Sequence, residues 1–290
     1  MKNTTKISAV LFFILSTSSA FAADNSADEQ DLLAYSQSVS NSYAQQITTL
    51  AGNSSCLKTS WKDRGRAPAG YIKGVALSFA RSLCRTKALG TPPAITKILA
   101  SSATGNTSRD ALSWYKSIFA SVGIPTNRSG EDAVRAVYTL GMGLGMRESS
   151  GKYCEGWDKS AGSRRSSSQA EAGIFQVSYD SIGASPELKA LYLEYQASPE
   201  RCHLATFKEG VTCKAQSILG TGAGATYQKF NKACPAFATE YGMAMLRLRR
   251  SHFGPINRKA AQVVSSCGAM LANVQKIVDS DQEAACAELY

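Results

Sequence analysis

The chain has 290 residues, of which 44% are hydrophobic and 19% charged. This composition can fill a packed core, and without a long biased tract or internal repeat it excludes collagen-like, wholly disordered and solenoid proteins. The sequence therefore predicts a folded globular protein.

The first residues carry the pattern of an export signal. Lys2 and Lys6 precede an apolar run from Ile7 to Leu15, and the small-residue stretch Ala20-Phe21-Ala22 follows. We expect cleavage after Ala22 or Ala23, which makes residues 1–22 a signal peptide and the mature protein secreted or periplasmic. A retained anchor is the alternative. No later segment offers about 18 uninterrupted apolar residues, so no membrane span is expected in the mature chain.

The mature protein is basic. Residues 1–22 contain two lysines and no acidic residue, so their removal lowers the formal charge from +10 to +8. For an exported protein this charge favours anionic partners such as cell-wall polymers. The densest basic clusters, Arg164-Arg165 and Arg247 with Arg249-Arg250, lack interleaved aromatic residues. No nucleic-acid partner is therefore expected, and the oligomeric state stays open.

All eight cysteines lie in the mature part, namely Cys56, Cys84, Cys154, Cys202, Cys213, Cys234, Cys267 and Cys286. An even number in an exported chain predicts four disulfides. The connectivity cannot be derived, but the short separations favour the pairs Cys213–Cys234 and Cys267–Cys286. The sequence has no C-x-x-C pair and only two histidines, so neither a metal site nor a cofactor is expected.

Residues 23–125 have the pattern of a helical N-terminal region without a reactive cluster. Apolar residues at steps of three and four predict helices over Leu32–Tyr43, Tyr71–Leu83, Ile95–Leu99 and Asp110–Val122. The segment Ile124–Gly130 is a candidate domain boundary. We therefore expect a second domain over residues 126–290.

The next predicted helix begins this second domain. Ser129 can cap it in a capping box closed by Asp132, and the helix should extend to about Arg147. Its small and apolar residues form one stripe, made of Val134, Val137, Tyr138, Gly141, Leu144 and Gly145. The same spacing continues to Glu148, and glycines at positions 141, 143 and 145 allow close packing beside it.

The position of Glu148 suggests acid catalysis. Partial burial and the negative pole of the helix both disfavour the ionised carboxylate, so both are expected to raise the pKa of Glu148. A glutamic acid that keeps its proton near neutrality can donate it to a poor leaving group such as a sugar oxygen. The alternative is a solvated glutamate before an ordinary helix stop at Ser149-Ser150-Gly151.

A polar segment from Ser149 to Ala172 follows and leads into the apolar run Gly173-Ile174-Phe175-Gln176-Val177. This change predicts a loop or small β-hairpin beside a cleft. Gly173 allows close approach of the backbone to a ligand, and the Gln176 amide can hydrogen-bond one. Aromatic residues at three positions can stack on sugar rings or, alternatively, belong to the core: Tyr153, Trp157 and Tyr179.

Two elements of this region together resemble a known family. Arg147-Glu148-Ser149-Ser150-Gly151 is similar to the R-E-S-x-x-G element of goose-type lysozymes and the related soluble lytic transglycosylases. The segment from Ala172 to Val177 is similar to their G-L-M-Q element, in the same order and at a comparable distance. The resemblance covers residues 129–179 and extends only loosely to Tyr290. It implies a lysozyme-like fold in which Glu148 is the catalytic acid and Ser149 and Gln176 line a glycan cleft.

The chain also departs from that family. Goose-type enzymes carry an aspartate in the intervening loop, for which Asp158 and Glu171 are both candidates here. The A-Y-N-A-G element of the transglycosylases has no counterpart, and the nearest candidates contain Tyr241, expected to open a helix, and Asn257, expected in a turn that faces the cleft. The chemical form of the product therefore stays open.

These patterns predict a mainly α protein with four disulfides. It would contain a lysozyme-like catalytic domain that cleaves β-1,4 bonds between N-acetylhexosamines of peptidoglycan. A chitin or chitosan hydrolase on the same scaffold and a wall-binding module without turnover are the alternatives. The glycine-rich stretch Gly220–Gly224 lacks a Walker lysine and is interpreted as a flexible surface loop.

Overall fold

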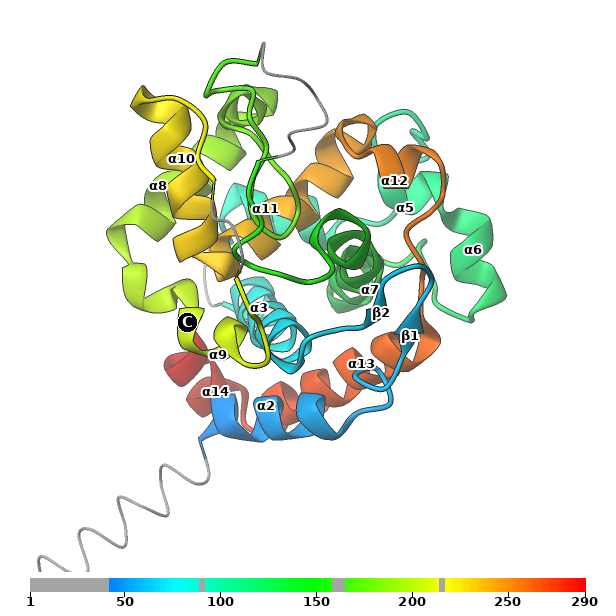
Figure 1. Ribbon diagram of the computed structural model, residues 1–290. Helices are drawn as coiled ribbons and strands as arrows, with labels where there is room; N and C mark the ends of the chain where they lie inside the picture. The colour runs from blue at the N-terminus through cyan, green and yellow to red at the C-terminus, as the bar shows by residue number, and fades with distance from the viewer. Residues whose placement is uncertain (1–41, 89–91, 158–164, 214–216) are drawn as a thin grey trace, which may run out of the picture. The chain divides into compact units, whose positions relative to one another are not determined.

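The computed structural model describes residues 42–88, 92–157, 165–213 and 217–290, which are mainly helical (Figure 1). The α-helices are α2 (Tyr43–Asn53), α3 (Ala69–Lys87), α4 (Ala94–Ala100), α5 (Ala111–Trp114), α6 (Lys116–Ser121), α7 (Glu131–Ser149), α8 (Pro186–Ala197), α9 (Leu204–Lys208), α10 (Gly222–Ala233), α11 (Pro235–Leu248), α12 (Gly254–Asn257), α13 (Ser265–Ser280) and α14 (Gln282–Leu289). Three 3-10 helices, η2 (Tyr179–Ala184), η3 (Pro199–Cys202) and η4 (Arg250–His252), join them. The predicted fold class, mainly α, is confirmed. The predicted signal peptide and most of the first predicted helix lie outside the described residues.

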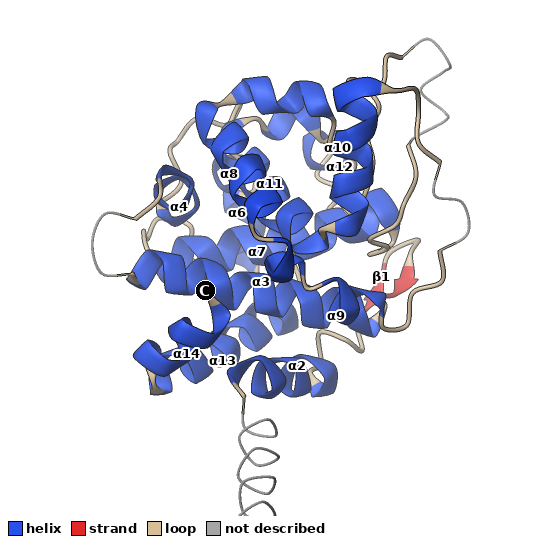
Figure 2. Ribbon diagram, turned by 90° about the vertical axis from the view of Figure 1, so that its left-hand side faces the viewer, coloured by secondary structure: helices blue, strands red, loops and turns tan. Residues whose placement is uncertain are grey.

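Helix α3 forms the centre of the core. It contacts α2, α7, α9, α11, α13 and α14. Every residue from Gly70 to Arg85 is buried except Lys73. Glycine makes this crowding possible, since a Cβ atom at Gly70 would lie 2.8 Å from the backbone nitrogen of Glu209. Figure 2 shows α2, α13 and α14 together on one side of α3.

Residues 42–290 form one compact unit, so the segments on both sides of the predicted domain boundary share one core. Two disulfides connect its ends: Cys56–Cys267 joins the chain after α2 to α13, and Cys84–Cys286 joins α3 to α14. The other two are Cys154–Cys213 and Cys202–Cys234. Four disulfides were expected and are present, but both pairs favoured from short separation are wrong. Packing of the two ends against each other brings together cysteines that are far apart in the sequence.

The long predicted helices are confirmed, with different ends at several places. Helix α7 begins at Glu131 after Gly130, whose φ is 74°, and no side chain caps it, so the predicted Ser129 capping box is wrong. The expected helix over 110–122 divides into α5 and α6 at Tyr115. Tyr241 lies in the middle of α11 rather than at its start.

The glycine-rich segment also differs from its prediction. Gly222 and Gly224 belong to the first turn of α10, whereas Gly220 precedes the helix. A Cβ atom at Gly224 would overlap the backbone of Ser167 and Ser168. The end of this segment therefore packs against the loop that precedes Glu171 instead of forming a free surface loop.

The two short strands β1 (Ser60–Trp61) and β2 (Gly65–Arg66) form an antiparallel hairpin that the sequence did not predict. Asp63 has a φ of 60° and Gly65 a φ of 70°, which the tight turn between the strands requires. The hairpin lies beside the C-terminal end of α7 (Figure 1). Among the described helices, none is long and apolar enough to cross a membrane.

Candidate active site

Glu148 lies in the last turn of α7, one residue before the helix ends, and is partly buried. Ser150 follows with a φ of 55°, and the Gly151 N–H donates to the Gly145 carbonyl at 3.2 Å. This is a left-handed helix cap, in which a residue after the helix turns back to satisfy its last carbonyls. The cap fixes where α7 stops and so fixes the position of the Glu148 backbone.

The glycines before Glu148 bring neighbouring segments close to α7, as predicted. A Cβ atom at Gly143 would lie 2.8 Å from the backbone nitrogen of Gln262, and one at Gly141 would overlap the Met243 side chain. At Gly145 the added atom would lie 2.9 Å from Tyr71 Cζ and 3.1 Å from Ile174 Cγ2. The turn that carries Ile174 therefore packs directly against the C-terminal part of α7.

This contact brings the two sequence elements together. Residues three apart on a helix share a face, so Glu148 lies on the face of α7 that meets Ile174 at Gly145. The Gly173–Gln176 turn and Glu148 thus occupy neighbouring positions at one end of the helix.

Backbone and packing contacts hold the Gly173–Gln176 turn in place. Ala172 and Val177 pair in an isolated antiparallel bridge, which closes the turn between them. The Gly173 N–H donates to the Glu155 carbonyl at 3.0 Å, and a Cβ atom at Gly173 would lie 3.3 Å from Asn231 Cβ. Gly173 thus allows a close approach of protein segments.

Gln176 uses its side chain to hold this turn. It is buried, has a φ of 48°, and its amide nitrogen donates to the carbonyls of Gly173 at 2.9 Å and Gly156 at 3.2 Å. These bonds connect the turn to the segment that contains Trp157. Gln176 therefore orders the wall of the site through its amide N–H groups.

Glu171, one of the two candidate helper carboxylates, lines a polar pocket of about 380 Å³. Its Oε1 lies 3.7 Å from His252 Nε2, and its Oε2 lies 3.7 Å from an Arg165 guanidinium nitrogen. His252 Nε2 is also 3.3 Å from the Gln176 carbonyl oxygen. Burial lowers the pKa of His252 below its usual value, so the ring is neutral and its Nε2–H donates to the Gln176 carbonyl, with the Glu171 carboxylate beside it. The other candidate, Asp158, lies outside the described residues.

The remaining predicted site residues have different surroundings. Ser149 is buried, and its hydroxyl donates to the Gly145 carbonyl at 3.0 Å. Tyr241 is also buried; its hydroxyl lies 2.7 Å from that of Ser181, which lines the Glu171 pocket, and burial raises its pKa to about 12. Asn257 is exposed on α12 and bonds locally to Arg250 and the Ser251 carbonyl.

The three aromatic candidates also differ from one another. Tyr153 is buried and lines a pocket beside α10. Tyr179 is partly buried and packs edge-on against Tyr227 with ring centres 5.9 Å apart, which favours its core interpretation. Trp157 is partly exposed, beside the Gly156 carbonyl that Gln176 holds.

The sequence did not identify the β1–β2 turn as a neighbour of the site. Arg147 donates to the Lys62 carbonyl at 3.1 Å and lies 3.3 Å from Asp63 Oδ2, while Arg64 donates to the Arg147 carbonyl. These bonds hold the residue next to Glu148. No local signal connects segments 84 residues apart, although the turn residues Asp63 and Gly65 could have indicated the hairpin itself. His252 was also missed, because its role depends on packing of η4 against the Gly173–Gln176 turn.

Comparisons with known protein families, with characterised proteins and with solved structures found no match for this chain. Within the described parts of the chain, His, Cys, Asp and Glu side chains do not form a group of three suited to a metal ion.

Proposed function

We propose that this protein is an exported enzyme that cleaves β-1,4 bonds between N-acetylhexosamines of peptidoglycan, with Glu148 as the general acid. The observation that most supports this is the neighbouring position of Glu148 and the Gly173–Gln176 turn. These elements carry the resemblance to goose-type lysozymes and lytic transglycosylases, and 24 residues separate Glu148 from Gly173 in the sequence.

In the proposed reaction, Glu148 donates its proton to the glycosidic oxygen as the bond to the anomeric carbon breaks. The positive charge that develops on the sugar then needs a partner. The oxygen of a substrate acetamido group can bond to the anomeric carbon and take up this charge. Attack by the sugar's own 6-hydroxyl, whose proton passes to the Glu148 carboxylate, would then give an anhydro product. A second carboxylate about 6.5–9.5 Å from the acid would instead activate water and invert the anomer.

Glu171 is our preferred helper carboxylate among the described residues. Its carboxylate faces a pocket large enough for several water molecules, beside the neutral ring of His252. His252, held by its hydrogen bond to the Gln176 carbonyl, would form the wall of the pocket beside that carboxylate. Asp158 remains the alternative helper, and substrate assistance applies if neither carboxylate is needed.

The test of the acid is Glu148→Gln, which removes the proton donor and preserves the shape of the side chain. We expect the variant to fold and to release soluble muropeptides from purified walls about 10²–10⁴-fold more slowly, the usual contribution of acid–base catalysis. Glu283→Gln, which makes the same change at an exposed position on α14, should keep the full rate. Digestion at the native rate by Glu148→Gln would end this assignment.

The products decide between hydrolysis and anhydro-sugar formation. Mass spectrometry of muropeptides separates the two, because the anhydro product lacks one water. Glu171→Gln and Asp158→Asn variants test the helper: loss of rate in one identifies it, and full activity of both favours substrate assistance.

The same preparations distinguish the alternative functions. A chitin or chitosan hydrolase would turn over soluble chitin oligomers faster than purified peptidoglycan. A wall-binding module without turnover would pellet with walls and release no muropeptides, and Glu148→Gln would leave its affinity unchanged.

A further inference from the structure

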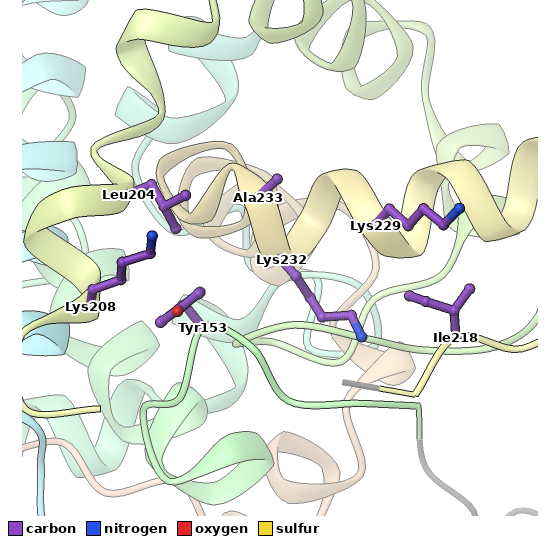
Figure 3. Close-up of a pocket in the computed structure, with 7 residues that line it drawn as sticks. All are labelled: Tyr153, Leu204, Lys208, Ile218, Lys229, Lys232 and Ala233. Carbon is purple, nitrogen blue, oxygen red and sulfur yellow. The ribbon is translucent and has the colours of Figure 1, made fainter. Parts of the chain in front are cut away.

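A second pocket, of about 360 Å³, lies on the side of α10 that faces α9 (Figure 3). Three lysines and four other residues line it: Tyr153, Leu204, Lys208, Ile218, Lys229, Lys232 and Ala233. They come from the segment after Glu148, from α9, from the chain before α10 and from α10 itself.

Two disulfides hold these walls together. Cys154 follows Tyr153 directly and is bonded to Cys213, which precedes the wall residue Ile218. Cys202 lies just before α9 and is bonded to Cys234, the residue after Ala233. Half of the disulfides in the protein therefore fix the segments that line this one pocket, which makes its shape preorganised.

Lys232 is the unusual residue of the pocket, because its side chain is almost completely buried. In Figure 3 it extends from α10 into the space between Tyr153 and Ile218. Its ammonium group donates to the Ser217 carbonyl at 3.1 Å. An ammonium group has three N–H donors, and among the described residues only the Ser217 carbonyl accepts one of them, which leaves donors for a ligand in the pocket.

Three lysine ammonium groups give this pocket a positive charge. Among the described residues, no carboxylate lies within ion-pair distance of Lys208, Lys229 or Lys232. Burial lowers the pKa of Lys232, and Glu155 is the acidic group whose charge opposes this effect. A buried cation next to two further lysines is costly unless an anion accompanies it.

We propose that this pocket binds the free carboxylate of a short peptide with small apolar side chains, such as the peptide stems attached to peptidoglycan sugars. Lys232 and its two neighbouring lysines would contact the carboxylate, and Leu204 and Ile218 would contact the apolar groups. This inference rests on the proposed function, because it names the part of that substrate which lies next to the cleaved sugar chain.

The pocket is adjacent to the candidate active site. Tyr153 lies five residues after Glu148, and Lys232 follows Asn231, which packs against Gly173 of the neighbouring turn. A peptide attached to a sugar near Glu148 would therefore have the pocket within its reach. Binding of that peptide would orient the sugar chain and distinguish peptidoglycan from chitin, which has no peptide.

The lining favours a carboxylate over a phosphate. Phosphate sites typically combine backbone N–H groups at a helix N-terminus with arginine forks. The described lining of this pocket includes no arginine, and the pocket lies at the C-terminal end of α10, whose negative pole disfavours a doubly charged anion more than a singly charged one. Its apolar residues alternate with the lysines around the pocket. Single carboxylates flanked by methyl groups match this arrangement better than a doubly charged phosphate.

The binding test uses N-acetylmuramoyl-alanyl-isoglutamine, which has one free carboxylate, and the same compound with that carboxylate converted to an amide. We expect calorimetry on the full-length protein to show about tenfold or tighter binding of the carboxylate form, as charge-assisted hydrogen bonds allow. Lys208→Met with Lys229→Met, both at exposed positions, should remove that preference without affecting the fold. Lys232→Met should remove it as well.

Lys276→Met is the matched control, because it removes the same charge from an exposed position on α13 outside the pocket. It should keep the native preference. Equal binding of both compounds to the native protein, or an unchanged preference in the double variant, would overturn the proposal. Displacement of the muramoyl dipeptide by inorganic phosphate at equal concentration would overturn the choice of carboxylate.

The kinetic test separates this proposal from the proposed function. On walls with intact stems the double variant should raise KM several-fold with little change in kcat, whereas on glycan chains stripped of peptides it should match the native enzyme. Glu148→Gln should abolish turnover on both substrates and still bind the muramoyl dipeptide. Carboxylate-selective binding by a protein without turnover would support the proposed peptide site and refute the proposed enzymatic function. Turnover with an equal KM on both substrates would support the enzymatic function and refute the peptide site.

Discussion

Gly145→Ala should be strongly destabilising although alanine is the better helix former. In an exposed helix this change would stabilise the protein by about 1 kcal/mol. At Gly145, however, the new methyl carbon would lie 2.9 Å from Tyr71 Cζ and 3.1 Å from Ile174 Cγ2, and still closer to the Tyr71 hydroxyl. That hydroxyl donates to the Met142 carbonyl at 2.9 Å and sits in the core, so it has nowhere to move without losing its partner.

The expected cost combines two effects. Overpacking a core typically costs about 1–3 kcal/mol, and a buried hydroxyl that loses its hydrogen bond costs about 1–3 kcal/mol. After subtraction of the gain in helix propensity, about 3 kcal/mol remains, which for a chain of this size corresponds to a fall in Tm of about 6–12 °C. The new methyl group would also displace Ile174, which belongs to the turn beside Glu148, so activity on walls should decrease as well.

Thermal and urea unfolding of Gly145→Ala measure this cost. Gly183→Ala is the control, since a Cβ atom there meets no atom within 4 Å, and it should change stability by less than about 0.5 kcal/mol. Tyr71→Phe removes the hydroxyl, so the double variant Gly145→Ala with Tyr71→Phe should lose less than the sum of the single changes. Native-like stability of Gly145→Ala would refute the close packing of α7 against Tyr71 and Ile174.

Two further predictions concern buried charges. Arg247 pairs with Asp110 at 2.9 Å and donates to the Ser101 carbonyl at 2.7 Å, and both charged side chains are almost fully buried. Arg247→Met should therefore lower the free energy of unfolding in urea by about 3–5 kcal/mol, because it leaves a buried carboxylate without its ion-pair partner. A loss below about 1 kcal/mol would contradict this reasoning. Burial lowers the pKa of His203 to about 4 from its usual value of 6.5. Between these two pH values the unfolded chain binds a proton that the folded chain does not, so the free energy of unfolding should fall as the pH is lowered through this window. His203→Asn, which tolerates the φ of 52° at this position, should flatten that dependence, and the same pH slope in variant and native protein would show that another group is responsible.

The sequence predicted what depends on local spacing. The apolar stripe from Val134 to Gly145 identified α7 and its glycine-lined face, and Tyr71–Leu83 identified most of α3, because a helix that packs against others repeats its buried positions every three to four residues. The capping signal at Ser129 misled, because Gly130 adopts a positive φ and turns the chain before the helix begins. A side chain that can cap a helix does so only if the backbone leads into the helix at that residue.

Features that depend on long-range packing could not be predicted in this way. The disulfides Cys56–Cys267 and Cys84–Cys286 span 211 and 202 residues, and nothing local distinguishes them from the short pairs that separation favours. The same holds for His252, whose contact with Glu171 exists only because η4 packs against the Gly173–Gln176 turn. Chemistry can therefore be assigned to single residues from the sequence, but partners cannot.

The candidate site illustrates how these two kinds of information combine. Glu148 lies on a helix that local spacing predicts, but its surroundings come from three segments that are distant in the sequence. The β1–β2 turn contacts α7 at Arg147, and the Gly173–Gln176 turn and Tyr71 of α3 contact it at Gly145. Each of these contacts is made to α7 within one turn of Glu148 and involves a glycine or an arginine rather than Glu148 itself. A change that shifts one of these contacts without altering a charge should thus move the carboxylate, which would appear as a lower kcat with the pH dependence of an ionising acid retained. Loss of the acid itself would instead remove the pH dependence together with the activity.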